Sequence, residues 1–258
     1  MNYIGIDIGS TCAKTVVLNE KKELILEFVQ PTGWSSIDTA EEIRQKLEFA
    51  GINLSNESSH CVATGYGRIS VPYADKTVTE ITCHALGAVH LFQHPDLTVI
   101  DIGGQDTKII QIEQGFVKDF IMNDKCAAGT GRFLEVMANT LSLRPNEMFD
   151  LARLGSDTTI SSMCTVFAES EVIGLIGKGE PKENIAYAVV NSTIRKVAAQ
   201  VSRMNGEMFT FCLTGGLCEC DYIREALSKE LGKDVFSCPD ARYAGAIGAA
   251  LSAMKVRR

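Results

Sequence analysis

Residues 5–18 read GIDIGSTCAKTVVL, and residues 99–112 read VIDIGGQDTKIIQI. Each stretch has two runs rich in Ile and Val around a turn of small residues, which predicts a β-hairpin with an aspartate near the end of its first strand. The stretches align without a gap and share an aspartate, a glycine and a lysine: Asp7 with Asp101, Gly9 with Gly103, and Lys14 with Lys108. An internal duplication accounts for this match, so we expect two similar lobes.

The segments around the repeat alternate between strand and helix patterns, which predicts an α/β fold. We expect further strands at 24–30, 61–65, 116–121 and 209–213. We expect helices at 36–50, 80–93, 132–142, 146–154, 166–178, 183–204, 221–231 and 241–255. The breaker His94-Pro95-Asp96 precedes the second copy of the repeat. We therefore expect a lobe I of residues 1–95, with the C-terminal helix 241–258 packing back on it, and a lobe II of residues 96–240.

The composition argues against several classes of protein. The 258 residues carry 25 basic and 32 acidic side chains, and the net charge of −7 argues against nucleic acid as a partner. No apolar run approaches the roughly 18 residues of a membrane helix, and the first ten residues lack the pattern of a signal peptide. We therefore expect a cytoplasmic protein with no membrane partner. Its nine cysteines, an odd number, make a poor disulfide framework and should stay reduced.

The repeated hairpins have the chemistry of a phosphate site. A glycine in the turn lets the backbone amides approach phosphate oxygens, and Asp7 or Asp101 could supply an oxygen to Mg²⁺. The apolar run 211–213 leads into Thr214-Gly215-Gly216, which suits a close approach to the nucleoside end of a nucleotide. For a single copy, the alternative is that Asp-x-Gly only marks a tight hairpin. The duplication favours two hairpins that hold a triphosphate.

These segments resemble a known superfamily. The order of the two Asp-x-Gly hairpins, the Thr-Gly-Gly turn and a small-residue helix at 244–250 is similar to the phosphate, adenosine and connecting motifs of the actin, hexokinase and Hsp70 ATPases. The resemblance implies two duplicated ribonuclease H-like α/β lobes around an ATP cleft. We assign Mg²⁺ to Asp7 and Asp101. By the general logic of phosphoryl transfer, Gln105 or Asp106 could orient the attacking water. The implied ATP or ADP contacts are Ser10, Thr11, Cys12, Ala13, Lys14, Gly103, Gly104 and Gln105 at the phosphates and Gly215 and Gly216 at the nucleoside.

Three further segments narrow the resemblance. Residues 64–68 (TGYGR), 123–133 (NDKCAAGTGRF) and 164–171 (CTVFAESE) resemble the activator components of 2-hydroxyacyl-CoA dehydratases, in the BadF/BadG/BcrA/BcrD-type ATPase family. That family also contains ATPase subunits of benzoyl-CoA reductases and reductases of double-cubane proteins. The resemblance implies one [4Fe-4S] cluster per homodimer, held by Cys126 and Cys164 of both subunits. The alternative is that both cysteines are buried core residues.

The other cysteines and the histidines receive no catalytic role. We expect Cys61, Cys83 and Cys212 in the core, while Cys218-x-Cys220 competes as a metal-binding pair. The thiol of Cys12 is expected to be incidental, and Cys238 has no partner that the sequence identifies. The spacing of His60, His84, His90 and His94 suggests packing or surface roles rather than a metal site.

The resemblance implies an ATP-dependent one-electron donor. Reduced ferredoxin or flavodoxin would supply the electron, and an iron–sulfur dehydratase or a double-cubane reductase component would accept it. Two other functions fit the same fold: a small-molecule kinase, and an iron-free ATPase that acts only by changing conformation. The sequence does not identify the electron acceptor, because no residue pattern identifies the docking surface.

Overall fold

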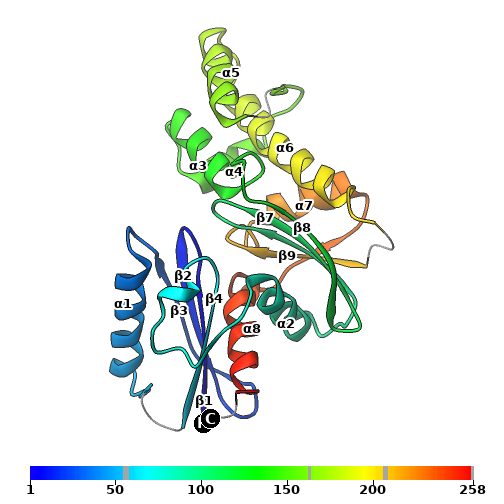
Figure 1. Cartoon of the computed structure of the whole chain (residues 1–258). Coiled ribbons are helices and arrows are strands. Elements are labelled where there is room, and N and C mark those ends of the chain that lie inside the picture. The colour runs from blue at the N-terminus through cyan, green and yellow to red at the C-terminus, as the bar shows by residue number, and fades with distance from the viewer. Residues whose placement is uncertain (55–57, 162–163, 206–208, 257–258) are drawn as a thin grey trace. The chain divides into compact units, whose positions relative to one another are not determined.

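The computed structural model describes residues 1–54, 58–161, 164–205 and 209–256, and these form two compact units. Unit 1 contains residues 1–97, 110–118 and 240–258, and unit 2 contains residues 98–109 and 119–239. The last two residues of the expected C-terminal segment 241–258 lie outside the described residues. Figure 1 shows the helices and strands of each unit.

Unit 1 is built on a mixed sheet with the strand order β3-β2-β1-β4-β5. Its elements are β1 (Asn2–Ile8), β2 (Cys12–Leu18), β3 (Leu24–Pro31), α1 (Ser36–Phe49), β4 (Ser59–Thr64), β5 (Lys76–Thr77), α2 (Glu80–Phe92) and α8 (Ala244–Ala253). The first two strands form the predicted hairpin, and its antiparallel register places Asp7 opposite Lys14. The parallel pairing of β1 with β4 places Thr64 on the other side of Asp7. The end of β1 therefore meets residues from three parts of the sequence.

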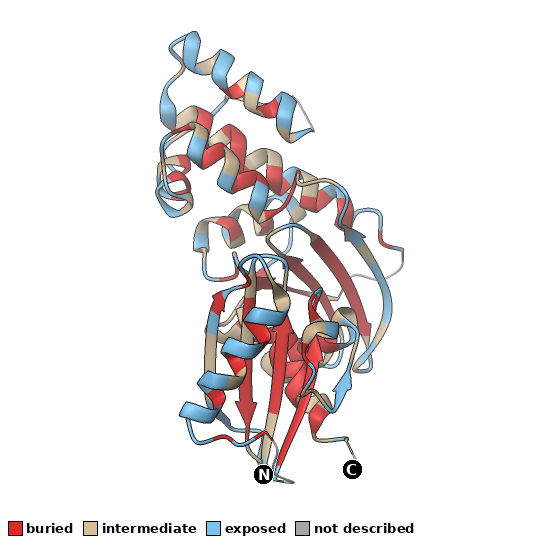
Figure 2. Cartoon of the chain, turned by 60° about the vertical axis from the view of Figure 1, so that its left-hand side comes forward, coloured by how far each residue is buried: buried red, intermediate tan, exposed pale blue. Residues whose placement is uncertain are grey.

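Alternation along the strands divides the core of unit 1 between two faces. Ile4, Ile6 and Ile8 are fully buried in a cluster with residues of α1. On the other face, a Cβ atom added at Gly5 would overlap the backbone of α8 at Ala246. Small side chains let α8 lie directly on the sheet, and Figure 2 shows how the buried residues gather on the strands.

Unit 2 is built on a second five-stranded sheet, with the order β10-β9-β6-β7-β8. Its strands are β6 (Leu97–Ile102), β7 (Thr107–Glu113), β8 (Phe116–Asn123), β9 (Thr210–Gly215) and β10 (Val235–Phe236). Its helices are α3 (Gly131–Thr140), α4 (Pro145–Ala152), α5 (Thr165–Gly177), α6 (Lys182–Val201) and α7 (Asp221–Leu231). Every strand and helix expected from the sequence is present, and the structure adds the two-residue strands β5 and β10. No described helix is long and apolar enough to cross a membrane.

The tip of the β7–β8 hairpin groups with unit 1, whereas the expected division at 95/96 assigned it to lobe II. The reason is local hydrogen bonding. The Gly115 amide donates to the Pro95 carbonyl at 2.8 Å, and the Gln114 amide donates to the Asp96 carboxylate at 2.7 Å. Residues 110–118 thus belong with the segment that precedes β6.

The close packing of α8 against α2 gives a stability prediction. A Cβ atom at Gly248 would overlap the carbonyl oxygen of Cys83, so we expect Gly248→Ala to lower the free energy of unfolding by about 2 kcal/mol. Gly174 in α5 is the matched control, because a Cβ atom there would meet nothing within 4 Å. Gly174→Ala should raise the free energy of unfolding by up to about 1 kcal/mol. Urea unfolding followed by circular dichroism measures both, and equal effects would contradict the packing.

Candidate functional site

The hairpin of unit 1 holds a buried carboxylate that is only partly compensated. Asp7 is 2% exposed, and its Oδ2 lies 4.0 Å from Nζ of the half-buried Lys14. Its Oδ1 has no hydrogen-bond partner among the residues that the structure describes. A buried carboxylate oxygen without a partner is costly. The carboxylate of Asp7 is therefore suited to bind a cation, or a water molecule that enters with a ligand.

Two glycines leave room around this carboxylate. A Cβ atom added at Gly65 would clash with Oδ1 of Asp7, and one added at Gly245 would lie 2.6 Å from Oδ2. Gly65 also has a φ of +82°, which favours glycine. The Gly67 amide donates to the Ile8 carbonyl at 2.8 Å, so the turn after β4 is fixed against the end of β1. A side chain at either glycine would close the space beside Asp7.

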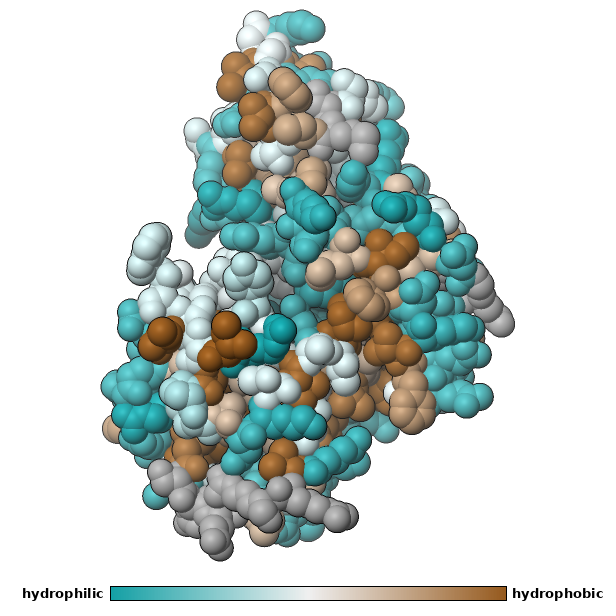
Figure 3. Space-filling view, viewed as in Figure 1, coloured by the Kyte–Doolittle hydropathy of each residue, from teal (hydrophilic) through white to brown (hydrophobic). Residues whose placement is uncertain are grey.

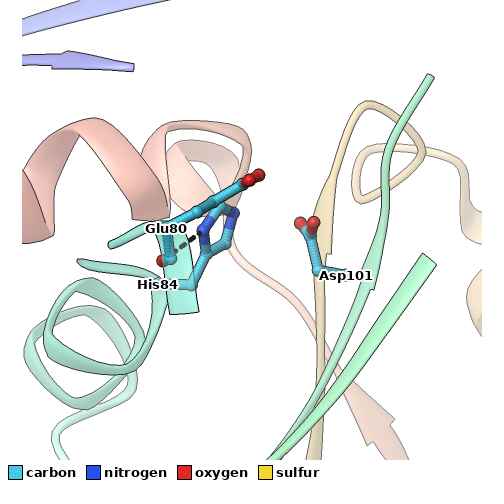
Figure 4. A group of neighbouring side chains, drawn as sticks. All are labelled: Glu80, His84 and Asp101. Atoms are coloured by element: carbon cyan, nitrogen blue, oxygen red, sulfur yellow. Dashed lines mark hydrogen bonds between the residues drawn. The ribbon is translucent and has the colours of Figure 1, made fainter. Parts of the chain in front are cut away.

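Helix α2 contributes a buried histidine, His84, that the sequence did not associate with this site. His84 is 5% exposed, and its Nδ1 lies 3.1 Å from the Glu80 carbonyl oxygen (Figure 4). A Cβ atom at Gly245 would lie 2.9 Å from Cε1 of His84, so the imidazole borders the same glycine as Asp7. The i, i+4 spacing of Glu80 and His84 was the available signal, because it places both on one side of a helix.

The hairpin of unit 2 holds its aspartate more tightly. Asp101, drawn in Figure 4 on β6, is 3% exposed and accepts a hydrogen bond from Thr214 Oγ1 at 2.8 Å. Nζ of Lys108 lies 3.3 Å from Asp101 Oδ2 and 2.8 Å from Asp106 Oδ2. Lys108 itself is only 1% exposed. The equivalent aspartates of the repeat thus differ in how far their charge is compensated.

The duplication extends beyond the hairpins. In unit 2, Gly215 has a φ of +84°, and a Cβ atom there would lie 2.8 Å from Oδ1 of Asp101. In unit 1 the same relation joins Gly65 to Asp7, and a threonine precedes the glycine in both units. The Thr64-Gly65 turn is therefore the structural counterpart of Thr214-Gly215, which the sequence alone did not identify.

Both hairpin turns are closed by the same backbone bond. The Gly9 amide donates to the Cys12 carbonyl at 3.1 Å, and the Gly103 amide donates to the Asp106 carbonyl at 2.9 Å. The remaining turn positions include both exposed and half-buried residues: Ser10, Thr11 and Gln105 are exposed, and Gly103 and Gly104 are half-buried. Ala13 is fully buried.

The two predicted cluster cysteines lie in unit 2 and are not core residues. Cys126 is half-buried in the loop between β8 and α3, where Asn123 Nδ2 donates to the carbonyls of Cys126 and Ala128 at 2.9 and 3.1 Å. Cys164 is exposed and is the N-cap residue of α5. Helix starts favour an anionic ligand. Among the described residues, no cysteine belongs to a group of three or more side chains that could hold a metal ion.

Hydrogen bonds join the hairpin of unit 2 to the start of α3 and to the cysteine loop. The Gly131 amide donates to the Gly103 carbonyl at 2.9 Å, and the Arg132 amide donates to the Gly104 carbonyl at 2.7 Å. Thr107 Oγ1 also donates to the Gly129 carbonyl at 2.6 Å. The start of α3, which follows the loop that carries Cys126, is thus bonded directly to the turn after β6, and the loop itself is bonded to β7.

The sequence matches a known ATPase family over almost its whole length. The model of the BadF/BadG/BcrA/BcrD ATPase family matches residues 4–253. The chain belongs to this family. It is 43% identical over 257 residues to the (R)-2-hydroxyglutaryl-CoA dehydratase activating ATPase of Acidaminococcus fermentans, covering 98% of this chain and 96% of that protein.

Solved structures agree with this membership. The A. fermentans (R)-2-hydroxyglutaryl-CoA dehydratase component A matches with a TM-score of 0.91 at 41% identity, covering 99% of this chain and 98% of that one. The activator of the 2-hydroxyisocaproyl-CoA dehydratase from Clostridium difficile, with bound ADPNP, matches with a TM-score of 0.88 at 33% identity, covering 100% and 99%. The family and the actin, hexokinase and Hsp70-like α/β fold expected from the sequence are confirmed.

The remaining thiols are mostly buried. The prediction that Cys61, Cys83 and Cys212 are core residues is confirmed, and burial raises the pKa of Cys83 and of Cys212 to about 12. Cys218 is also buried, while Cys220 is half-buried at the N-cap of α7, where burial raises the pKa of its thiol.

These differences predict the order of alkylation of the iron-free protein by iodoacetamide at pH 8. A raised pKa lowers the thiolate fraction at this pH, so Cys83 and Cys212 should react at least about a hundredfold more slowly than the exposed Cys164. Peptide mass spectrometry measures each rate. In guanidinium-unfolded protein all the thiols should react at similar rates, and equal rates in the native protein would contradict the burial.

The buried ion pairs of unit 2 give a second prediction. Replacing Lys108 with Met removes the cation between two carboxylates, so the free energy of unfolding should fall by about 3 kcal/mol or more. Lys118→Met is the control, because Lys118 and Glu113 form an exposed ion pair at 2.5 Å, and it should cost less than about 1 kcal/mol. Similar losses in urea unfolding would show that Lys108 is not a buried counter-ion.

Proposed function

We propose that the chain is an ATP-dependent one-electron donor that reduces an iron–sulfur partner enzyme. The observation that carries this proposal is the bonding of Gly131 and Arg132 to the turn at Gly103 and Gly104, because it links the proposed phosphate turn to the helix that directly follows the Cys126 loop. The electron acceptor would be a 2-hydroxyacyl-CoA dehydratase or a double-cubane cluster protein. The names of two relatives, both dehydratase activators, support the dehydratase. Ferredoxin or flavodoxin would supply the electron, in the cytoplasm, where thiols stay reduced.

The nucleotide assignments follow from family membership and from the hairpins. ADPNP in a related activator supports ATP or ADP as the ligand. Asp7 fits Mg²⁺, because one of its buried oxygens has no partner among the described residues and two glycines leave space beside it. Asp101 already accepts from Thr214 and faces Lys108, so we assign it to Mg²⁺ through water.

The contacts to the nucleotide would come mainly from turn amides. Ser10, Thr11, Cys12, Ala13, Lys14, Gly103 and Gly104 would bind the phosphates, and Gly215 and Gly216 the nucleoside end. Gln105 is exposed at its turn, whereas Asp106 is engaged by Lys108. We therefore assign the orientation of the attacking water to Gln105 rather than Asp106.

Cys126 and Cys164 would hold half of a [4Fe-4S] cluster. Such a cluster takes four thiolates, and two copies of the chain related by a twofold axis would supply them. When bound, the cluster would supply a site for one low-potential electron. Helix α5, which starts after Cys164, buries only Ala168 and Val172. Its exposed apolar side chains (Figure 3) are Val166, Phe167, Ile173 and Ile176, and they support a homodimer interface.

Iron analysis of variants tests this assignment. Anaerobically reconstituted wild-type protein should contain about two iron and two sulfide per chain, and both Cys126→Ala and Cys164→Ala should lose them. Cys220→Ala is the matched control for Cys164→Ala, because both residues are helix N-caps. It should keep the iron.

Two results would contradict the proposal in different ways. Full iron in Cys164→Ala would refute the ligand assignment. An iron-free wild-type protein from an iron-replete anaerobic preparation would refute electron transfer. Phosphorylation of a metabolite or nucleotide-dependent client binding by that iron-free protein would then identify a kinase or a conformational ATPase.

A further inference from the structure

Unit 2 contains a cavity that neither the nucleotide nor the cluster assignment uses. It has a volume of about 200 Å³ and lies between helix α6, the segment 128–129 and the segment 158–161. The first of these segments follows Cys126, and the second precedes Cys164. The cavity is thus bounded by both cysteine-bearing parts of the chain.

Two cations of α6 line this cavity. Arg195 is exposed and Lys196 is half-buried, and among the described residues neither side chain has an ion pair or a hydrogen bond. The chain has more acidic than basic side chains, with a net charge of −7. Two neighbouring cations without an acidic partner in the described part of the chain, such as Arg195 and Lys196, are therefore notable. Ser192 and Thr159 also line the cavity, and their hydroxyl groups can donate hydrogen bonds.

A buried amide close to Gly129 and Lys196 also lacks hydrogen-bond partners among the described residues. Gly129 has a φ of +86°, and a Cβ atom there would lie 2.8 Å from Cγ of Lys196 and 4.0 Å from Nε2 of Gln200. Gln200, one turn along α6, is 4% exposed, and both polar atoms of its carboxamide lack a partner among the described residues. Buried amide groups are normally hydrogen-bonded. Gln200 does not itself line the cavity, but its unsatisfied carboxamide lies next to Gly129, which does.

Two acidic side chains are bonded to residues that line the cavity, and Glu180 accepts a hydrogen bond from Thr158 Oγ1 at 2.5 Å. The carboxylate of Glu171 accepts two hydrogen bonds from the Ser161 amide, at 3.0 and 3.1 Å, and further bonds from its hydroxyl. These bonds hold the segment before Cys164 against α5. The carboxylate of Glu171 therefore faces the Ser161 amide, and Arg195 and Lys196 supply the positive charge at the cavity.

We propose that this cavity binds a small oxyanion, a phosphate or carboxylate group, between Arg195, Lys196 and the hydroxyls of Ser192 and Thr159. Guanidinium and ammonium groups form their strongest hydrogen bonds with such groups. A bound oxyanion bridges α6 to the segments after Cys126 and before Cys164. It therefore stabilises the cysteine-bearing loops, whether or not the chain transfers electrons.

Binding of inorganic phosphate and of citrate to the full chain tests the proposal. Isothermal titration at constant ionic strength should show saturable binding of at least one of the two probes, and which of them binds separates a phosphate ligand from a carboxylate ligand. Arg195→Gln and Lys196→Gln should each weaken that binding about tenfold or more. Arg203→Gln is the control, because Arg203 is an exposed arginine just beyond α6 that does not line the cavity, and it should bind as the wild type does.

Hydrogen exchange supplies a second readout in the wild-type protein. The bound probe should slow amide exchange in peptides that cover 128–129 and 158–161, and the effect should disappear in Lys196→Gln. The proposal is overturned if neither probe binds saturably, or if binding persists unchanged in both variants. Binding that Arg203→Gln weakens equally would also overturn it, because it would show general attraction of anions by surface charge.

Discussion

The burial of an aspartate opposite a lysine in each hairpin is the constraint on which both units depend. A carboxylate removed from water must regain hydrogen bonds or a counter-ion. In unit 2 this requirement is met by the protein itself, because Lys108 and Thr214 both reach Asp101. In unit 1 it is met only in part, since Lys14 lies 4.0 Å from Asp7 and one carboxylate oxygen lacks a partner among the described residues. The duplicated framework thus retains one compensated aspartate and one whose charge a ligand can compensate.

The glycines of the two units follow from this constraint. Gly65 and Gly245 lie against Asp7, and Gly215 lies against Asp101, each at a position where a Cβ atom would meet the carboxylate. Larger residues there would push the backbone away and remove the space that a cation or phosphate needs. The small side chains of α8 have a related effect, because they allow Gly245 to reach the end of β1.

The hairpins, the order of the helices and the burial of three cysteines could be predicted because each leaves a local pattern. The Ile and Val runs around Asp-x-Gly occur twice, and Cys61, Cys83 and Cys212 stand in apolar elements. The placement of His84 and of the Thr64-Gly65 turn beside Asp7 could not be predicted in the same way. It depends on the parallel pairing of β1 with β4 and on the packing of α2, which join segments more than fifty residues apart. The two-residue strands β5 and β10 are too short for any periodicity to show.

The turns after β1 and β6 also differ in the residues that hold them. This difference determines which other parts of the chain a movement of each turn would affect. In unit 1 the turn is held by Thr32, whose hydroxyl donates to the Gly9 carbonyl and whose amide donates to the Thr11 carbonyl. In unit 2 the turn is held by the first residues of α3, and Thr140 at the far end of α3 donates to Glu169 of α5 at 3.2 Å. Helix α3 therefore connects the turn at Gly103 to the helix that follows Cys164. A phosphate that moved this turn would act directly on the start of α3, which follows the Cys126 loop, and on α5 through α3, because backbone hydrogen bonds and packed helices resist relative displacement.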